Sequence, residues 1–225
     1  MTLPPVPLLI VGAGGFARET AQLVHAVNEV TPTWDLLGHL DDDPAKQGTV
    51  VDGVPVLGGS GEAAAREDAK IVVCTGSPRD YASRARVVAR LGLPVERYAT
   101  LVHPAAAVSR TSSIGPGSVV LAQVVLTAAV TVGAHVSVMP HVTLTHDDVI
   151  GDFATLAAGA RLAGGVHVER GAYIGSGALV RETLTIGSYA LVGMGSVVTR
   201  DIPPREVWAG VPARFVRPSH VTDGA

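Results

Sequence analysis

The chain has 225 residues, a formal net charge of −3 and 47% hydrophobic residues, with only 4% aromatic residues and 26 glycines. It carries no long block of like charges, which argues against a nucleic-acid partner. Cys74 is the only cysteine, so an intrachain disulfide and a cysteine metal cluster are both excluded. Many glycines and a core of small and β-branched side chains favour tight, repetitive β-structure.

The chain is expected to be cytoplasmic, without a membrane span. Its first residues lack the basic region and the cleavage site of a signal peptide. The apolar run from Val119 to Met139 is long enough to suggest a span, but Gln123, Thr131 and His135 interrupt it.

The first hundred residues predict a small α/β unit. Apolar runs that read as strands alternate with helical stretches, and this alternation is typical of a parallel sheet. In chain order the predicted elements are a strand over 8–11, a helix over 18–30, a strand over 36–40, a strand over 71–74 and a helix over 80–91.

The first turn, Gly12 to Ala17, matches G-x-G-x-x-A between a strand and a helix. Glycines let a phosphate approach the backbone, and a helix N-terminus favours negative charge, although a tight turn without a ligand explains the same pattern. Asp41 ends the second strand, where a carboxylate can bind a ribose hydroxyl. About 100 residues supply too few strands for a full dinucleotide domain, so a single nucleotide such as UDP fits better.

From Val102 onward, every sixth residue is aliphatic. The 17 positions are Val102, Val108, Ile114, Val120, Leu126, Val132, Val138, Leu144, Ile150, Leu156, Leu162, Val168, Ile174, Val180, Ile186, Val192 and Val198. The fourth residue after each is mostly small, and Asp148 is the one charged member of that set. A period of six fits neither an α-helix nor an amphipathic strand, and it predicts a parallel β-helix.

This repeat resembles the hexapeptide-repeat proteins, which form a left-handed coil with three hexapeptides per turn. The resemblance implies about five to six turns. The pattern breaks at Pro203-Pro204, and the segment with Trp208 is expected to leave the prism and pack along its side. We therefore predict a Rossmann-like nucleotide-sugar-binding domain over 1–101, a left-handed β-helix over 102–202 and a C-terminal tail over 203–225.

His146-Asp147-Asp148 is the strongest catalytic candidate. Acyl transfer from a thioester needs a base, a partner that orients it and an N–H group that stabilises the oxyanion, and histidine is the usual base. His146 falls at a predicted corner with carboxylates beside it. With 18 residues per turn, Gly164 lies one turn further along, and a glycine there leaves an uncovered N–H beside the histidine.

Almost the whole chain resembles the sugar O-acyltransferase and sialic acid O-acetyltransferase family, which includes bacterial UDP-4-amino-sugar N-acetyltransferases of surface-glycan synthesis. The segments that carry the resemblance are GAGGFARE (12–19), LDDD (40–43), THDDVIGDF (145–153), LAGGV (162–166) and GVPAR (210–214).

The resemblance implies a role for each matching residue. His146 is the expected general base, Asp147 orients it, and the amide of Gly164 contacts the acetyl carbonyl. Acetyl-CoA is the expected co-substrate, bound by Gly164, Gly175, Ser176, Gly193 and Met194. The sugar nucleotide is expected at Gly14, Gly15, Phe16, Asp41, Asp42 and Gly76. The family also implies a homotrimer with sites between neighbouring subunits, and it implies no metal.

Three positions depart from the family pattern. Some relatives have His where Phe16 stands, many have Asn where Met139 stands, and some have a second His where Thr155 stands. These departures leave acetyl transfer intact and put the acceptor in question.

The preferred interpretation is N-acetylation of an amino group on a nucleotide-linked sugar. O-acetylation of a sialic-acid-like sugar or another hydroxyl needs the same base chemistry. A zinc hydro-lyase would need three histidines that converge between subunits, which His135, His141 and His146 do not form in the expected way. A scaffold that has lost its chemistry is the last alternative, and the retained His146, Asp147 and Gly164 argue against it.

Overall fold

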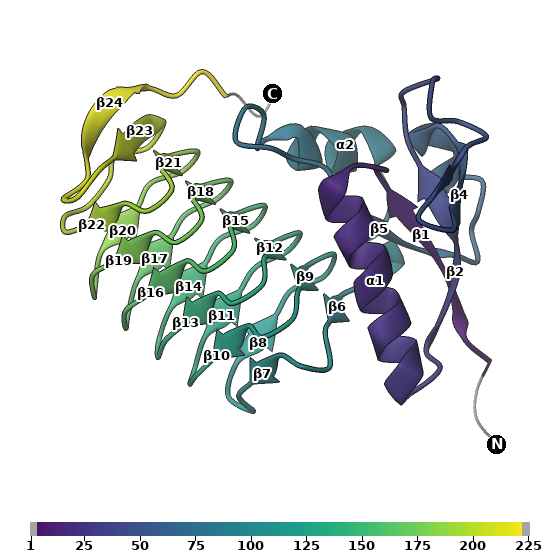
Figure 1. Ribbon diagram of the computed structural model, residues 1–225, viewed down its shortest axis with the longest axis horizontal. Coiled ribbons are helices and arrows are strands. Elements are labelled where there is room, and N and C mark those ends of the chain that lie inside the picture. The colour runs from purple at the N-terminus through teal and green to yellow at the C-terminus, as the bar shows by residue number, and fades with distance from the viewer. Residues whose placement is uncertain (1–3, 222–225) are drawn as a thin grey trace.

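The computed structural model describes residues 4–221, in which an α/β region lies beside a long coil of short strands (Figure 1). The α/β region holds a five-stranded sheet in the order β3-β4-β2-β1-β5. Its elements are β1 (Val6–Val11), α1 (Gly15–Val30), β2 (Trp34–Leu40), β3 (Val50–Val51), β4 (Val54–Gly58), β5 (Lys70–Val73) and α2 (Ser83–Leu91), with short 3-10 helices at Ser60–Ala63 and Val95–Arg97.

The sheet is parallel at its centre, as the alternation of strands and helices predicts. β1 pairs in parallel with β2 on one side and β5 on the other, and β4 extends the sheet in parallel from β2. The hairpin of β3 and β4 was not predicted, because β3 has only two residues and shows no period. Helix α1 begins at Gly15, three residues before the predicted start, because the extended Gly14 is its N-cap.

The coil confirms the parallel left-handed β-helix that the six-residue period predicts. Its strands form three sheets. The first sheet holds β6 (Leu101–Val102), β9 (Val119–Val120), β12 (Ser137–Val138), β15 (Thr155–Leu156), β18 (Tyr173–Ile174) and β21 (Leu191–Val192). The second holds β7 (Ala107–Val108), β10 (Val125–Leu126), β13 (Thr143–Leu144), β16 (Arg161–Leu162), β19 (Leu179–Val180) and β22 (Val197–Val198). The third holds β8 (Ser113–Ile114), β11 (Thr131–Val132), β14 (Val149–Ile150), β17 (His167–Val168) and β20 (Thr185–Ile186).

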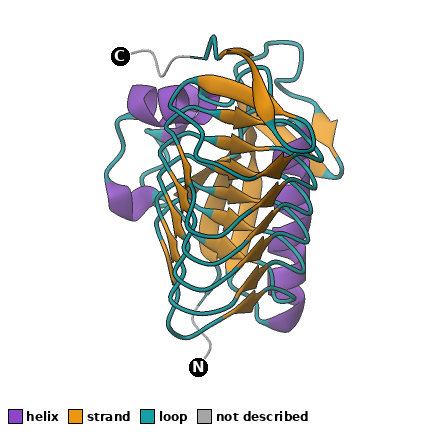
Figure 2. Ribbon diagram, turned by 90° about the vertical axis from the view of Figure 1, so that its left-hand side faces the viewer, coloured by secondary structure: helices purple, strands orange, loops and turns teal. Residues whose placement is uncertain are grey.

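Each turn of the coil advances the chain by 18 residues. Leu126 pairs with Leu144, and Leu144 pairs with Leu162, always in parallel. The aliphatic residues of the repeat point into the prism, where Leu144 and Leu156 are fully buried. Figure 2 shows the strands of successive turns stacked, with loops at the corners. The period thus fixes both the register and the core.

Polar residues in the small-residue slot tie one turn to the next. The hydroxyl of Ser118 accepts a hydrogen bond from Val136 N at 2.9 Å, and Oδ1 of Asp148 accepts one from Val166 N at 2.8 Å. Oδ2 of Asp148 accepts a further bond from Thr145 N at 2.9 Å. Burial raises the pKa of Asp148 to about 6, although both backbone N–H groups favour its ionised form.

The tail follows its expected course only in its last part. Its first residues continue the prism, because β23 (Glu206–Ala209) pairs in parallel with β21 and so extends the first sheet. β24 (Arg214–Pro218) then turns back antiparallel to β23. The chain next returns toward α2, and the hydroxyl groups of Tyr81 and Ser219 are hydrogen-bonded (Figure 1). Residues 222–225 of the predicted tail, and residues 1–3 of the predicted first domain, lie outside the described residues.

A shared apolar core joins the α/β region to the first sheet of the coil. Leu8 of β1 and Ala21 of α1 belong to the same buried cluster as Leu101, Val119 and Leu121 of the coil. This contact sets the glycine turn before α1 above the first sheet. Between residues 4 and 221, no helix has the length and apolar character needed to cross a bilayer.

Alanine substitutions at two glycines of the coil should lower the free energy of unfolding by different amounts. A Cβ at Gly151 would lie 2.7 Å from the backbone nitrogen of Arg170, whereas Gly177 has φ of +67° and open space around it. We expect Gly151→Ala to lower the free energy of unfolding by about 2 kcal/mol or more through overpacking. Gly177→Ala should cost about 1 kcal/mol through backbone strain alone. Denaturant unfolding of both variants checks the order, and equal costs would contradict the close-approach argument.

The buried carboxyl of Asp148 predicts a pH-dependent stability difference. Because its pKa is raised to about 6, the folded chain holds this proton more tightly than the unfolded chain does. The stabilisation from this group is therefore full at low pH and is lost as pH rises through 6. Relative to wild type, Asp148→Asn should gain stability as pH rises from about 4 to about 6, as measured by denaturant unfolding. A difference that does not change with pH would refute this expectation.

Candidate active site

His146 and Asp147 stand together at the corner between the second and third sheets, in the loop from β13 to β14. Nδ1 of His146 lies 2.9 Å from Oδ2 of Asp147, and both side chains are 69% exposed. Asp147 has φ of +64°, the left-handed conformation that turns the chain at this corner. The hydrogen bond fixes the orientation of the imidazole and directs Nε2 away from the carboxylate.

Gly164 lies one turn along, directly against the imidazole ring of His146. A Cβ at residue 164 would lie 2.3 Å from Cε1 and 2.4 Å from Nε2 of the ring. Gly165 N donates to the carbonyl oxygen of His146 at 2.9 Å, which holds the two turns together. Within residues 4–221, the N–H of Gly164 donates no hydrogen bond. The structure therefore brings together a histidine, its carboxylate partner and an unused backbone donor.

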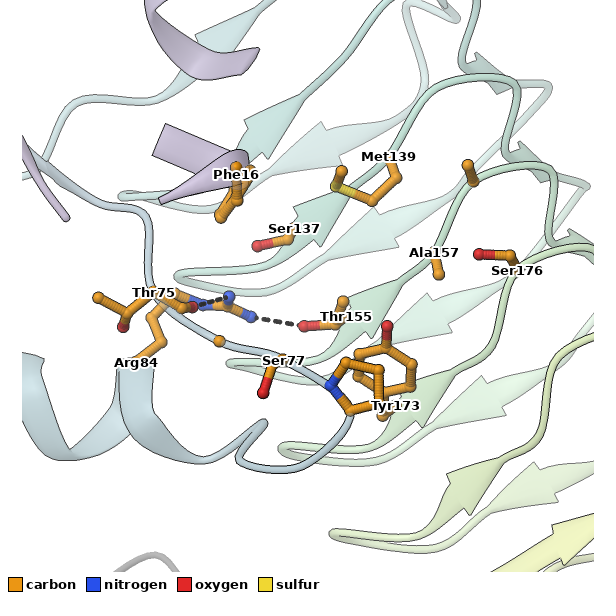
Figure 3. Close-up of a pocket in the computed structure, with 14 residues that line it drawn as sticks. Phe16, Thr75, Ser77, Arg84, Ser137, Met139, Thr155, Ala157, Tyr173 and Ser176 are labelled. Carbon is orange, nitrogen blue, oxygen red and sulfur yellow. Dashed lines mark hydrogen bonds between the residues drawn. The ribbon is translucent and has the colours of Figure 1, made fainter. Parts of the chain in front are cut away.

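A separate cavity of about 340 Å³ lies between the α/β region and the first sheet. The start of α1 and the segment after β5 form one wall, and β12, β15 and β18 form the other (Figure 3). Its lining residues are Gly15, Phe16, Thr75, Gly76, Ser77, Pro78, Arg84, Ser137, Met139, Thr155, Ala157, Ala158, Tyr173 and Ser176.

Three residues expected at the sugar nucleotide, Gly15, Phe16 and Gly76, line this cavity together with Ser176, which was expected at CoA. Gly14 is the N-cap of α1 beside them, and nothing lies within 4 Å of where its Cβ would be. The glycine turn thus presents open backbone to the cavity region.

Asp41 and Asp42 do not line the cavity, and their carboxylates are bound by other residues of the chain. Oδ2 of Asp41 accepts hydrogen bonds from Ala13 N at 2.8 Å and from Lys46 Nζ at 2.9 Å. Burial acts to raise the pKa of Asp41, but hydrogen bonds from Asp43 N, Lys46 and Ala13 N outweigh it and lower the pKa. Asp41 therefore holds the glycine turn in place.

Asp42 is bound in a similar way. Its carboxylate accepts a hydrogen bond from Ser60 N at 2.8 Å and forms an ion pair with Arg90. Burial acts to raise its pKa, and the contacts with Ser60 and Arg90 lower it overall.

The remaining residues expected at CoA follow β18 and β21, at the corner between the first and second sheets. A Cβ at Gly175 would lie 2.6 Å from Met194 N, and one at Gly193 would lie 2.8 Å from Cβ of Ala209. Packing of the coil and of β23 therefore requires both glycines. Met194 is 81% exposed at this corner.

A single chain does not bring all the expected site residues together. His146, Asp147 and Gly164 occupy the corner between the second and third sheets, whereas the cavity lies against the first sheet and its corner with the second. Three histidines considered as zinc ligands, His135, His141 and His146, stand at three different corners. Among the described residues, no group of three or more His, Cys, Asp or Glu could hold a metal ion.

Several residues of the cavity were not predicted from the sequence as site residues. Met139 and Thr155 stand out in the sequence only because they depart from the pattern of the family that the chain resembles. Arg84 gave no signal, because an arginine in the helical stretch SRARVVAR is ordinary. Ser137 and Tyr173 occupy outward positions of the repeat, where composition is unconstrained.

Known proteins share this architecture. Residues 7–91 match the family model described as the PglD N-terminal domain. The acetyltransferase domain of PglB from Neisseria gonorrhoeae FA1090, also solved with acetyl coenzyme A, is 31% identical with a TM-score of 0.81, over 94% of this chain and 100% of that chain.

A second solved structure is PerB from Caulobacter crescentus in complex with CoA and GDP-perosamine. It is 28% identical with a TM-score of 0.82, over 93% of this chain and 97% of that chain. The galactoside O-acetyltransferase of Escherichia coli (strain K12) is 49% identical over 39 residues, which span 17% of this chain and 19% of that protein. The fold, the full-length similarity and the corner histidine all indicate the same family. The chain therefore belongs to the hexapeptide-repeat sugar acetyltransferases.

Proposed function

We propose that this enzyme transfers the acetyl group of acetyl-CoA to the amino group of a nucleotide-linked sugar. The observation that carries the proposal is the His146–Asp147 hydrogen bond with Gly164 packed against the same ring. The relatives solved with acetyl-CoA, and with CoA and GDP-perosamine, support the two substrate classes.

His146 would act as the general base. Asp147 holds Nδ1 in its protonated form, which leaves the lone pair of Nε2 free to accept a proton. The amine nitrogen attacks the thioester carbonyl carbon as Nε2 takes the amine proton. The C–S bond then breaks, and the imidazolium returns that proton to the thiolate, giving the amide and free CoA.

The N–H of Gly164 would stabilise the oxyanion of the tetrahedral intermediate. It has no acceptor among the described residues, and it lies beside the atom that acts as base. A donor held by two stacked turns needs no rearrangement as negative charge develops on the carbonyl oxygen. A glycine is required because a Cβ would displace the imidazole.

The substrates would occupy the other expected positions. The nucleotide part of the acceptor would lie near Gly14, Gly15, Phe16 and Gly76, with Asp41 and Asp42 fixing the loops around it. CoA would lie along the corner that carries Gly175, Ser176, Gly193 and Met194.

We further infer that the active enzyme is a homotrimer with each site between two copies. His146 is exposed at one corner, while the cavity lies against another face of the same prism. Parallel packing of three prisms about a three-fold axis brings unlike corners of neighbouring copies together. The base of one copy would then serve the cavity of the next.

The first prediction concerns the base. His146→Ala should lower kcat by at least about 100-fold, because general-base catalysis contributes that much, with little change in the KM of acetyl-CoA. Release of CoA, followed with a thiol reagent, measures this across UDP- and GDP-linked amino sugars and matched hydroxy sugars. The hydroxy sugars test O-acetylation in the same assay.

His167→Ala is the matched control, because His167 is an exposed histidine of β17 on the third sheet. It should leave kcat unchanged. Full activity of His146→Ala with the best acceptor would reject His146 as the base.

The second prediction concerns the shared site. We expect His146→Ala and Ala157→Trp, which fills the cavity, to be inactive alone. Mixed trimers made by co-expression should recover about a quarter of wild-type activity, because about one site in four then pairs an intact base with an intact cavity. Activity of gel-filtered mixed trimers measures this, and no recovery would place the whole site within one chain.

A further inference from the structure

Arg84 is a fully buried arginine at the junction between the α/β region and the coil. It lies at the start of α2 and is only 2% exposed, yet it lines the cavity between the two regions (Figure 3). It is the largest of the fully buried side chains in the described chain.

Every hydrogen bond of the Arg84 guanidinium goes to a neutral acceptor. Nε donates to His135 O at 2.7 Å, and Nη1 donates to Thr75 O at 3.1 Å. Nη2 donates to Phe153 O at 2.9 Å, to Ala154 O at 3.1 Å and to Thr155 Oγ1 at 3.0 Å. One of the two N–H groups of Nη1 thus has no acceptor among the described residues.

Among the described residues, no carboxylate balances the charge of Arg84. No ion pair of Arg84 exists within residues 4–221, whereas Arg86 and Arg90 on the same helix pair with Asp80 and Asp42. Burial lowers the pKa of Arg84 to about 10, so it is still protonated at neutral pH. A buried and unpaired charge is costly, which suggests that an anion completes this environment.

The rest of the cavity favours an anion as well. Arg84 is the one charged residue among its 14 lining residues. The N-terminus of the 16-residue helix α1 opens on the same cavity at Gly15 and Phe16, and no side chain caps it in the described chain. Backbone N–H groups and the helix dipole at such an end attract negative charge.

We propose that Arg84 provides the positive charge that binds the diphosphate of a substrate in this cavity. The same guanidinium joins the segment after β5, through Thr75 O, to the turn before β15, and so holds that segment against the first sheet. Both substrates of the proposed function, the sugar nucleotide and CoA, carry a diphosphate. Either could therefore supply the diphosphate that Arg84 binds, and the experiment below distinguishes them. The inference rests on the proposed function for the identity of these two sources.

Isothermal titration calorimetry with two variants tests the charge separately from the packing. Arg84→Gln keeps hydrogen-bond donors and removes the charge, while Arg84→Lys keeps the charge. The charged ligands are UDP, GDP, CoA and inorganic diphosphate, and the neutral matches are uridine, guanosine and pantetheine. Arg86→Gln is the control on the same helix, because Arg86 is paired with Asp80 and lies outside the cavity lining.

We expect Arg84→Gln to weaken binding of inorganic diphosphate, and of either the two nucleotides or CoA, about tenfold and to leave the neutral matches unchanged. Arg84→Lys should stay within about threefold of wild type. A loss confined to UDP and GDP assigns the subsite to the sugar nucleotide, and a loss confined to CoA assigns it to CoA. Unchanged diphosphate binding, or an equal loss with uridine and pantetheine, would overturn the proposal.

A second measurement covers the case in which Arg84→Gln does not fold. The Nε resonance of Arg84 in the wild-type protein, assigned by its absence in Arg84→Lys, should shift with inorganic diphosphate and not with uridine. The absence of a shift would overturn the proposal.

The subsite and the proposed function can fail separately. Charge-dependent diphosphate binding without acetyl transfer to any acceptor would reject the proposed function and keep this subsite. Acetyl transfer by the enzyme, together with normal diphosphate binding by Arg84→Gln, would keep the proposed function and reject this subsite.

Discussion

The 18-residue register of the parallel coil is the constraint on which the rest of the molecule depends. Each strand pairs with the strand one turn away, so like positions stack along the whole prism. This stacking places Gly164 against His146 and ties Asp148 to Val166. An insertion of one residue in that segment would move every later side chain to the opposite side of its strand.

The same register explains why several glycines of the coil are required for packing. A Cβ at Gly115, Gly133, Gly151 or Gly175 would collide with the backbone of the next turn. At Gly164 the collision would instead be with the imidazole of His146. A Cβ at Gly117 would likewise meet the imidazole of His135, so close packing alone does not mark a catalytic glycine. What distinguishes Gly164 is that its histidine is exposed and paired with Asp147, whereas His135 is buried.

Contacts between the two regions add a second level of organisation. The shared apolar core of α1 and the first sheet fixes the distance between them, and Arg84 fixes the polar edge of the same junction. The cavity lies between these elements. Its walls come from residues as distant in sequence as Gly15 and Ser176, so binding there depends on the docking of one region on the other.

The sequence by itself determined the β-helix, its register and its core, because a hydrophobic period over 17 hexapeptides admits one regular structure. It also determined the pair of His146 and Gly164, since the separation of 18 residues is one turn. Tertiary structure alone decided the extension of the first sheet by β23, the engagement of Asp41 and Asp42, and the cavity with Arg84. These features depend on contacts between distant segments that no local pattern encodes, because burial of a charged side chain is set by its neighbours in space.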